Sequence, residues 1–114
     1  MSSGYSNLFT AMAEECGIEC VSISGYSKGA GYYPGKKNLE IDHDWNAVNI
    51  EGQWCLLDAT WGAGHSQGDQ YVTEYDESYW LMDPKKFIIM HFPEEPEWQL
   101  LDEQWSFALW QKHP

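Results

Sequence analysis

The chain has 114 residues, enough for one domain that buries about two-thirds of the surface exposed by its unfolded form. Hydrophobic residues make up 43% and aromatic residues 16% of the sequence, which excludes a disordered tail, and no apolar run approaches the roughly 20 residues of a membrane span. The formal net charge of −12 opposes binding to phosphate backbones and to anionic lipid, so we expect neither nucleic acid nor a membrane as a partner.

The cysteines and the first residues indicate the compartment and the extent of the chain. There are three cysteines, an odd number, and the N-terminus lacks the basic and apolar regions of a secretory signal. We therefore expect reduced thiols and an intracellular, cytoplasmic location. The sequence opens on Met1-Ser2-Ser3-Gly4 without a leader or linker, so we interpret residues 1–114 as a single domain and as a fragment lacking upstream segments.

The first predicted element is a helix over residues 4–16. Ser2 and Ser3 can cap its N-terminus, and Gly17 can end it because glycine readily adopts the left-handed conformation found after many helices. Apolar residues follow at the spacing of one helical face, namely Leu8, Phe9, Met12 and Ala13.

The next segments predict a strand and two loops. Residues 20–26 alternate small polar and apolar side chains, as a strand does. Residues 27–42 and 61–70 are rich in glycine, and we expect both to be loops.

The C-terminal third predicts shorter elements. We expect a short strand over residues 79–82, then a helix that Asp83 caps, that Pro84 opens and that ends near Met90. Residues 97–110 show no clear periodicity, and we interpret the acidic residues between 94 and 103 as a solvated edge.

The centre of the chain predicts a β-hairpin. Two apolar-rich runs, HDWNAVNI and QWCLLDAT, flank a two-residue Glu-Gly link. With such a link the numbers of paired residues sum to 103, so Trp45 faces Asp58 and His43 faces Thr60. Side chains alternate between the faces of a strand, so all four side chains share one face of the predicted sheet.

His43 and Asp58 form the most informative pair in this hairpin. Diagonal neighbours across two strands lie about 7–8 Å apart at the backbone, and these side chains can close that gap. A carboxylate that holds one imidazole nitrogen fixes the tautomer and orientation of the ring, which is half of a nucleophile–His–Asp triad. The alternative is a structural hydrogen bond at a sheet edge.

The nucleophile of such a triad is less evident. Strand parity puts Cys55 on the opposite face from Asp58, in the core, and Cys16 and Cys20 lie at the far end of the predicted helix. We expect these three thiols to be mostly unreactive, because none lies at a helix start. Ser2 or Ser3 does lie there, although plain N-capping is the simpler explanation for a serine at that position.

Other motifs in the sequence do not meet the requirements of a metal site or a dinucleotide-binding site. Asp42-x-Asp44-x-Asn46 begins like a calcium loop but has Ala47 where glycine is needed, and no helix is predicted after Gly29-x-Gly31. His65 and His91 lack partners at metal-ligand spacing, so we expect them to be surface or core residues. The sequence therefore predicts no metal and no cofactor.

Several segments resemble the transglutaminase-like core of the kyphoscoliosis peptidase and hillarin family, which includes cytokinesis and muscle-cytoskeleton proteins. They are GYSNLF, ECGIECVSISGYSKGAGY and HDWNAVNIEGQWCLLDATWGAG, and YWLMDPKKFIIMHFPEEPEWQLL resembles the part that follows that core. The resemblance covers residues 2 to about 101, and its most specific motifs are H-x-W-N-A-V and L-x-D-A-T-W-G-A-G.

This resemblance implies an α+β, papain-like fold, with an N-terminal helix packed on an antiparallel sheet. It assigns His43 as base and then acid, and Asp58 as the residue that orients His43. The nucleophilic cysteine of the family stands two residues before the Gly-Tyr of the helix, where this chain has Ser2. The implied reaction is acyl transfer from a protein amide to cysteine and then to water or an amine.

Ser2 departs from the family pattern. A hydroxyl does not form the thiolate–imidazolium pair on which such a site depends, so we expect no turnover with Ser2 in place. A natural pseudoenzyme, an inactivating substitution and a truncated chain with an altered start are the three explanations that the sequence leaves open.

Two functions follow from this reading. The first is the thiol peptidase or cross-linking site of the family acting on a protein or peptide, and the second is a non-catalytic module that binds cytoskeletal proteins. A carbohydrate- or peptide-binding domain is a weaker alternative, because the matched motifs already contain three of the seven tryptophans, Trp45, Trp54 and Trp61.

Overall fold

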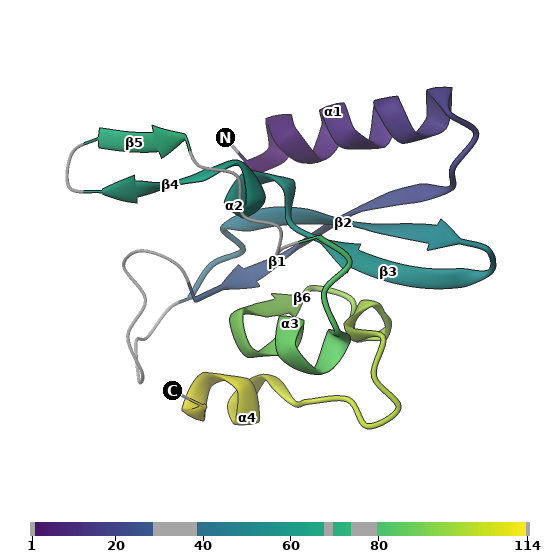
Figure 1. Cartoon of the computed structure of the whole chain (residues 1–114). Coiled ribbons are helices and arrows are strands. Elements are labelled where there is room, and N and C mark those ends of the chain that lie inside the picture. Colours follow the sequence, from purple (N-terminus) through teal and green to yellow (C-terminus); the bar gives the residue numbers. More distant parts are fainter. Residues whose placement is uncertain (1, 29–38, 68–69, 74–79, 114) are drawn as a thin grey trace.

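An antiparallel sheet with the strand order β3-β2-β1-β6 forms the centre of the molecule (Figure 1). The computed structural model describes residues 2–28, 39–67, 70–73 and 80–113; the side chains of residues 2, 62–67 and 70–73 lie outside that description. The strands of the sheet are β1 (Cys20–Ser27), β2 (His43–Ile50), β3 (Gln53–Leu57) and β6 (His91–Pro93).

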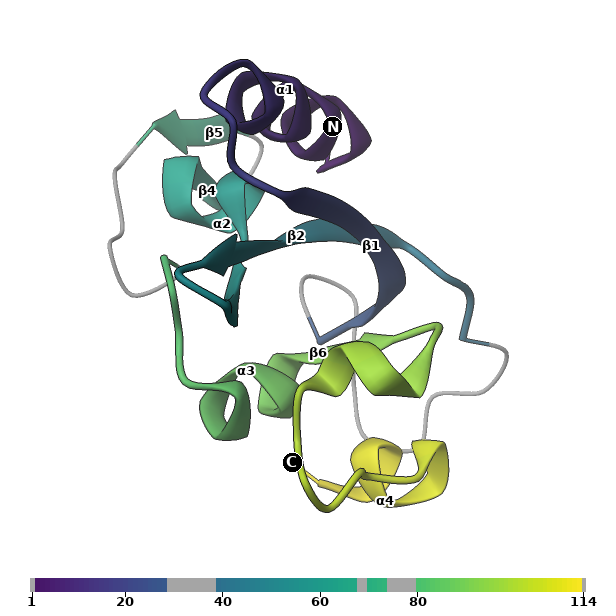
Figure 2. The same cartoon turned by 90° about the vertical axis from the view of Figure 1, so that its right-hand side faces the viewer.

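Helices cover both faces of this sheet (Figure 2). Helix α1 (Ser2–Glu15) lies on one face, and α3 (Pro84–Met90) lies on the other together with the 3₁₀ helix η2 (Pro96–Gln99) and α4 (Phe107–Lys112). The short helix α2 (Ala59–Ala63) leads into a separate two-stranded sheet of β4 (Gly64–Gln67) and β5 (Gln70–Thr73). This arrangement confirms the predicted α+β class, whereas the papain-like core stays a prediction.

Helix α1 begins and ends slightly earlier than predicted. Ser2 and Ser3 belong to its first turn rather than preceding it. At its other end the amide of Gly17 donates to the carbonyl of Glu14 at 3.0 Å, and the amide of Ile18 donates to that of Ala13 at 2.9 Å. Gly17 has φ +75°, so it ends the helix in the left-handed conformation, as predicted.

The apolar side chains of α1 extend beyond the surface that the sheet covers. Ala13 is buried and Phe9 packs against the same cluster of residues. Leu8 and Met12 were predicted on the same apolar face, yet they are 60% and 58% exposed. The reason is that α1 packs against one sheet face only. That face covers a narrow stripe of the helix, and the four apolar side chains spread over a wider arc than this stripe.

The predicted hairpin register is confirmed between residues 46 and 57. Asn46 pairs with Leu57 and Val48 with Cys55, and both pairs sum to 103. The link residues Glu51 and Gly52 have φ +53° and +87°, the signs required by a two-residue type I′ turn.

Beyond Leu57 the predicted register is wrong. Asp58 and Thr60 do not pair with Trp45 and His43, because the chain leaves the sheet after β3 and turns into α2. The turn is held by Asp58, whose Oδ1 accepts the backbone N–H of Trp61 at 2.9 Å.

The remaining segments agree in part with the elements predicted for them. Strand β1 and helix α3 are confirmed, the latter with Asp83 accepting the amide of Lys85 at 3.0 Å. The loop predicted over 61–70 is wrong where α2 and β4 occupy it. Residues 80–82 form no strand beyond a single bridge between Met82 and Leu56, and residue 79 and most of the predicted 27–42 loop lie outside the described residues.

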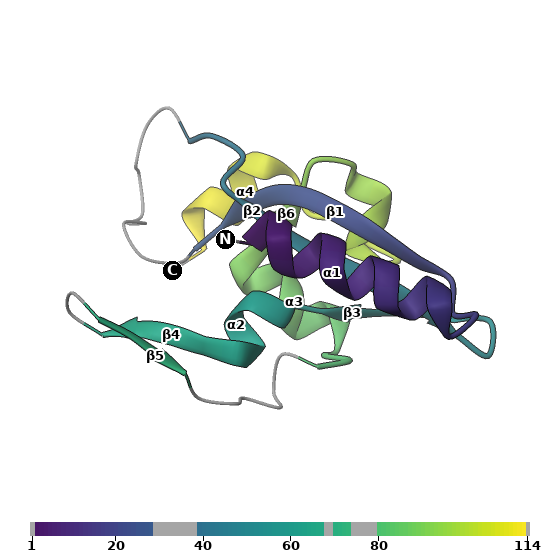
Figure 3. The ribbon, with the colours of Figure 1, turned by 90° about the horizontal axis from the view of Figure 1, so that it is seen from above.

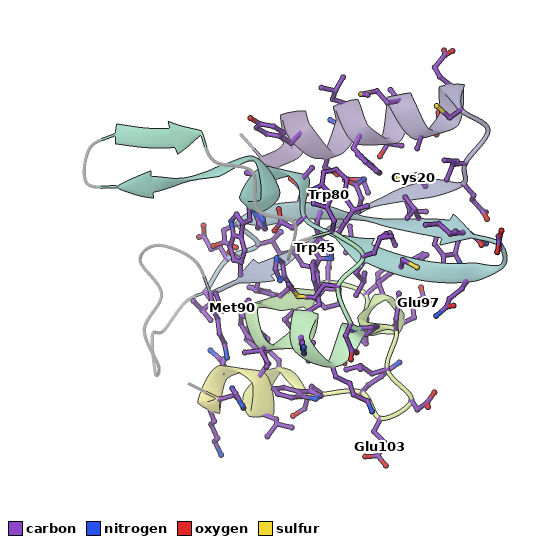
Figure 4. All side chains as sticks on the ribbon, viewed as in Figure 1. Cys20, Trp45, Trp80, Met90, Glu97 and Glu103 are labelled. Atoms are coloured by element: carbon purple, nitrogen blue, oxygen red, sulfur yellow. The ribbon has the colours of Figure 1, made fainter. Side chains whose placement is uncertain are left out.

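The core is divided by the sheet into two sides (Figure 4). Cys20 lies on the α1 side with Ala13, Val48 and Leu57, and Cys55 is half-buried there rather than in the core as predicted. Trp45 lies on the α3 side, where the buried residues are Ile23, Trp45, Ala47, Leu56 and Phe87.

The C-terminal segment is fixed to β1 by a buried lysine. Lys28 Nζ donates to the carbonyls of Trp110 and His113 at 2.5 and 2.6 Å and lies 4.5 Å from the centroid of the Trp110 ring. The acidic residues between 94 and 103 are exposed, as predicted. In the part of the chain that the structure describes, no helix has the length and apolar character needed to cross a membrane.

Candidate active site

Three buried polar side chains converge at one end of the sheet. His43 is the first residue of β2, Asp58 directly follows β3, and His91 joins α3 to β6. Their exposed fractions are 7%, 0% and 1%. A buried carboxylate and two buried imidazoles are costly to remove from water unless they satisfy one another by hydrogen bonds.

Asp58 accepts a hydrogen bond from each histidine. His43 Nε2 lies 2.6 Å from Asp58 Oδ2, and His91 Nε2 lies 2.7 Å from the same oxygen. Because an ionised carboxylate only accepts hydrogen bonds, both Nε2 atoms carry the proton. The predicted hydrogen bond between His43 and Asp58 is therefore present, although Asp58 lies after its strand rather than within it.

This pairing keeps Asp58 ionised. Burial by itself raises the pKa of a carboxyl group, but the hydrogen bonds from His43 and His91 outweigh burial here and lower the pKa of Asp58 to about 2. A carboxylate that stays charged stabilises an adjacent imidazolium, which is the role of the acid in a nucleophile–His–Asp triad.

The second nitrogen of His43 is the one left for chemistry. With Nε2–H directed at Asp58, Nδ1 carries the lone pair, and within the described residues no hydrogen bond reaches it. The ring of Trp61 stacks on His43 with centroids 4.9 Å apart and an interplanar angle of 26°. Trp61 and Asp58 thus fix the ring from two sides, and Nδ1 can act as a base.

The start of helix α1 lies at the end of the sheet that carries His43. Figure 3 shows α1 beginning near the start of β2, and α1 also contacts α2. His43 shares the α3 side with Trp45, so a nucleophile at the start of α1 has to approach its ring around the end of the sheet. The Ser2 side chain is among those left undescribed, and its predicted proximity to His43 stays a prediction.

A hydrogen-bond network fixes α1 relative to β2. Asn46 Nδ2 donates to Thr10 Oγ1 at 2.9 Å and to the carbonyl of Val21 at 3.1 Å. Ser6, one turn earlier, donates from its hydroxyl to the carbonyl of Trp45 at 3.2 Å. The Asn of the H-x-W-N-A-V motif therefore locks the helix register on which the geometry of the helix start depends.

His91 is the residue of the site that the sequence did not reveal. It was predicted to be a surface or core residue without partners at metal spacing; it is a core residue, but Asp58 is its partner. The two residues are 33 positions apart in the sequence, with helix α3 between them, so no short sequence spacing indicated the contact. The strand β6 that places His91 was not predicted either, so no local pattern marked this histidine.

The distances within this cluster are those of hydrogen bonds rather than of a metal site. His43, Asp58 and His91 each offer a ligand atom within 4.8 Å of the others. Ligand atoms held about 2.0–2.1 Å from a tetrahedral zinc ion lie about 3.3 Å apart, however, whereas the two nitrogen–oxygen distances here are 2.6 and 2.7 Å. The three groups form an acid–base cluster as they stand.

Comparison with known proteins gives several relatives of this chain, while no protein-family model matches it. It is 46% identical to kyphoscoliosis peptidase of Mus musculus over 101 residues, which cover 86% of this chain and 15% of that protein. It is 39% identical over 111 residues to hillarin of Drosophila melanogaster, covering 85% of this chain and 14% of that protein.

A third relative carries a transglutaminase domain in its name. The chain is 33% identical over 123 residues to the Lim and transglutaminase domain protein ltd-1 of Caenorhabditis elegans, covering 96% of this chain and 17% of that protein. The chain thus spans roughly one-sixth of the length of these relatives.

Proposed function

Because the chain belongs to the family of kyphoscoliosis peptidase and hillarin, we propose that it is a transglutaminase-like domain built as a thiol acyl-transfer site, with Ser2 at the position of the nucleophile. The observation that supports this most is the 2.6 Å hydrogen bond from His43 Nε2 to Asp58, which leaves Nδ1 as a base. It preserves the acid–base half of the site.

The chemistry of such a site divides between its members. A thiol at position 2 gives its proton to His43 Nδ1, and the thiolate attacks the carbonyl of a protein amide. The imidazolium returns the proton to the leaving amine, which leaves a thioester that water or a second amine resolves. Asp58 holds the ring throughout and stabilises its charge.

Ser2 removes the first step of this sequence. A serine hydroxyl stays protonated at neutral pH, and the family site depends on a thiolate formed beside an imidazolium and a helix start. We therefore expect no detectable peptidase or transglutaminase turnover in the unchanged chain.

Labelling with a thiol-directed electrophile tests this proposal. The rate is measured at position 2 by peptide mass spectrometry in Ser2→Cys and in Ser2→Cys/His43→Ala, so that any slow labelling of the exposed Cys16 is counted separately. We expect labelling at neutral pH to be at least about tenfold faster with His43 present, since the imidazole promotes ionisation of the thiol. Ser3→Cys, one position along the same helix, is the matched control and should not depend on His43. Equal rates at position 2 with and without His43 would remove the catalytic proposal.

A second candidate function is a non-catalytic module that binds cytoskeletal proteins. Ser2 favours it, because the fold and the His–Asp pair persist without the thiol. The exposed apolar residues Leu8 and Met12 on α1 offer a surface for such a partner. Cosedimentation of the unchanged chain with actin filaments and with microtubules tests it: binding that Leu8→Ser/Met12→Ser abolishes supports the module, and no binding to either filament argues against it.

A further inference from the structure

One carboxylate oxygen serves two histidines from different parts of the chain. Asp58 Oδ2 accepts from His43 at 2.6 Å and from His91 at 2.7 Å, while Oδ1 accepts the backbone amide of Trp61. A triad needs one of these histidines. The second reaches the same oxygen from β6, and no step of the acyl transfer uses it.

Three aromatic rings of the described residues pack around the ring of His91. Phe87 stacks on it with centroids 3.8 Å apart and an interplanar angle of 13°, and Trp45 and Trp61 lie at 5.0 and 4.6 Å. Among the described residues, Asp58 and His43 are the titratable groups that face it. A ring held this tightly presents Nε2 to Asp58 in a single orientation.

Burial also decides the charge of His91. Removal from water is the largest influence and lowers the pKa of His91, outweighing the opposite effect of Asp58, and a proton on His43 lowers it further. Its Nδ1 lies 3.2 Å from the carbonyl of Phe87, a contact that favours a proton on Nδ1 and so raises the pKa of His91, but this effect is the smallest on the ring; burial leaves one proton, which the charged Asp58 oxygen holds on Nε2. His91 is therefore a neutral donor.

We propose that His91 is a positioning residue that acts through Asp58: its ring donates Nε2–H to Oδ2 and holds the carboxylate ionised and directed at His43. The consequence for catalysis rests on the proposed function, whereas the hydrogen-bonded arrangement does not. The two histidines thus have different tasks. In the proposed reaction His43 gains and loses a proton at Nδ1, whereas His91 keeps its single proton on Nε2, in the hydrogen bond to Asp58.

A purely structural histidine would behave differently. If His91 merely filled space between Phe87, Trp45 and Trp61, an apolar residue of similar size would leave the ionisation of Asp58 unchanged. If it positions Asp58, loss of its N–H raises the pH at which that carboxylate takes up a proton, because one of the three hydrogen bonds to the charged form is gone.

The first test needs no substitution. Nitrogen-15 NMR of the unchanged chain at neutral pH distinguishes the two neutral tautomers and the charged form of each histidine. We expect His91 to be neutral with its proton on Nε2. A proton on Nδ1 alone, or a charged His91 ring, would overturn the proposal.

The second test follows the carboxyl carbon of Asp58 by carbon-13 NMR as the pH is lowered, with Asp58→Asn used to assign the signal. We expect His91→Phe to raise the midpoint by at least about one pH unit, equivalent to a tenfold change. His91→Gln keeps a donor at similar reach and should return most of that shift. Circular dichroism confirms folding at each pH, and His91→Met replaces the phenylalanine variant if that variant does not fold. An unchanged midpoint in a folded donor-free variant contradicts the proposal.

A third measurement separates this inference from the proposed function. In Ser2→Cys, the added change His91→Phe should slow labelling at position 2 on the acid side of the pH profile and have little effect where the thiol ionises unaided. If the Asp58 midpoint shifts while labelling never depends on His43, the positioning role stands and the catalytic function fails. If labelling depends on His43 but His91→Phe changes neither the pH profile of labelling nor the Asp58 midpoint, the function stands and this inference fails.

Discussion

Asn46 shows how a single side chain can set the geometry of a site to which it does not belong. It is fully buried, and its amide joins Thr10 on α1 to the backbone of β1. Polar contacts of this kind fix one register where apolar packing tolerates several, because each hydrogen bond has a required length and direction. The start of α1 is therefore placed relative to His43 from within the sheet.

We expect Asn46→Ala to lower the free energy of unfolding by about 1–3 kcal/mol, because it removes a fully buried side chain and leaves the half-buried Thr10 and Val21 without this partner. Urea denaturation followed by tryptophan fluorescence measures the change. Asn49→Ala is the matched control: Asn49 lies on the same strand and donates to the exposed Glu19, so its loss should cost less than about 0.5 kcal/mol. Equal effects of the two substitutions would mean that the buried network does not hold the helix.

At the scale of the elements, the site depends on how closely β6 approaches β1. Gly25 of β1 pairs with both His43 and Pro93. A Cβ atom at Gly25 would lie 2.2 Å from the carbonyl oxygen of Phe92 and 2.6 Å from the Trp45 ring. Any larger residue at position 25 would push β6, and His91 with it, away from β1. Glycine is therefore required here.

Gly25→Ala should therefore destabilise the fold by about 1–3 kcal/mol and weaken the contact between His91 and Asp58. Thermal unfolding measures the first effect and the nitrogen-15 spectrum of His91 measures the second. In Gly4→Ala, nothing lies within 4 Å of the added Cβ, so this control should be neutral or slightly stabilising within its helix. A His91 spectrum unchanged in a folded Gly25→Ala would show that β6 can shift without disturbing the site.

Features set by residues close together in the sequence could be predicted, and features set by contacts between distant residues could not. The hairpin register was predictable because Glu51 and Gly52 set it locally, and the stop at Gly17 follows from one residue. The turn at Asp58 was missed because its own side chain takes the amide of Trp61 and ends the strand. The second histidine was missed because its contact with Asp58 forms only after α3 has packed.

At the scale of the whole molecule, the buried cluster ties stability to pH. The pKa of His91 is lowered from its ordinary value of 6.5, so below that pH the unfolded chain binds a proton that the folded chain does not. The pKa of Asp58 is lowered from 3.8 to about 2, so the same holds for Asp58 below pH 3.8. Both groups contribute stability at neutral pH, and both lose it as the pH falls.

We accordingly expect the free energy of unfolding to fall in two stages on acidification, first below about pH 6.5 and again below about pH 4, where Asp58 accounts for about 2 kcal/mol. Urea denaturation at a series of pH values between 7 and 2 measures both stages. His91→Phe should flatten the first, because the unfolded chain then has no residue 91 to protonate, and Asp58→Asn should flatten the second. Asp102→Asn, at an exposed position, is the control and should keep the shape of the curve. Stability that stays constant or rises on acidification would mean that the cluster does not hold Asp58 ionised against a neutral His91.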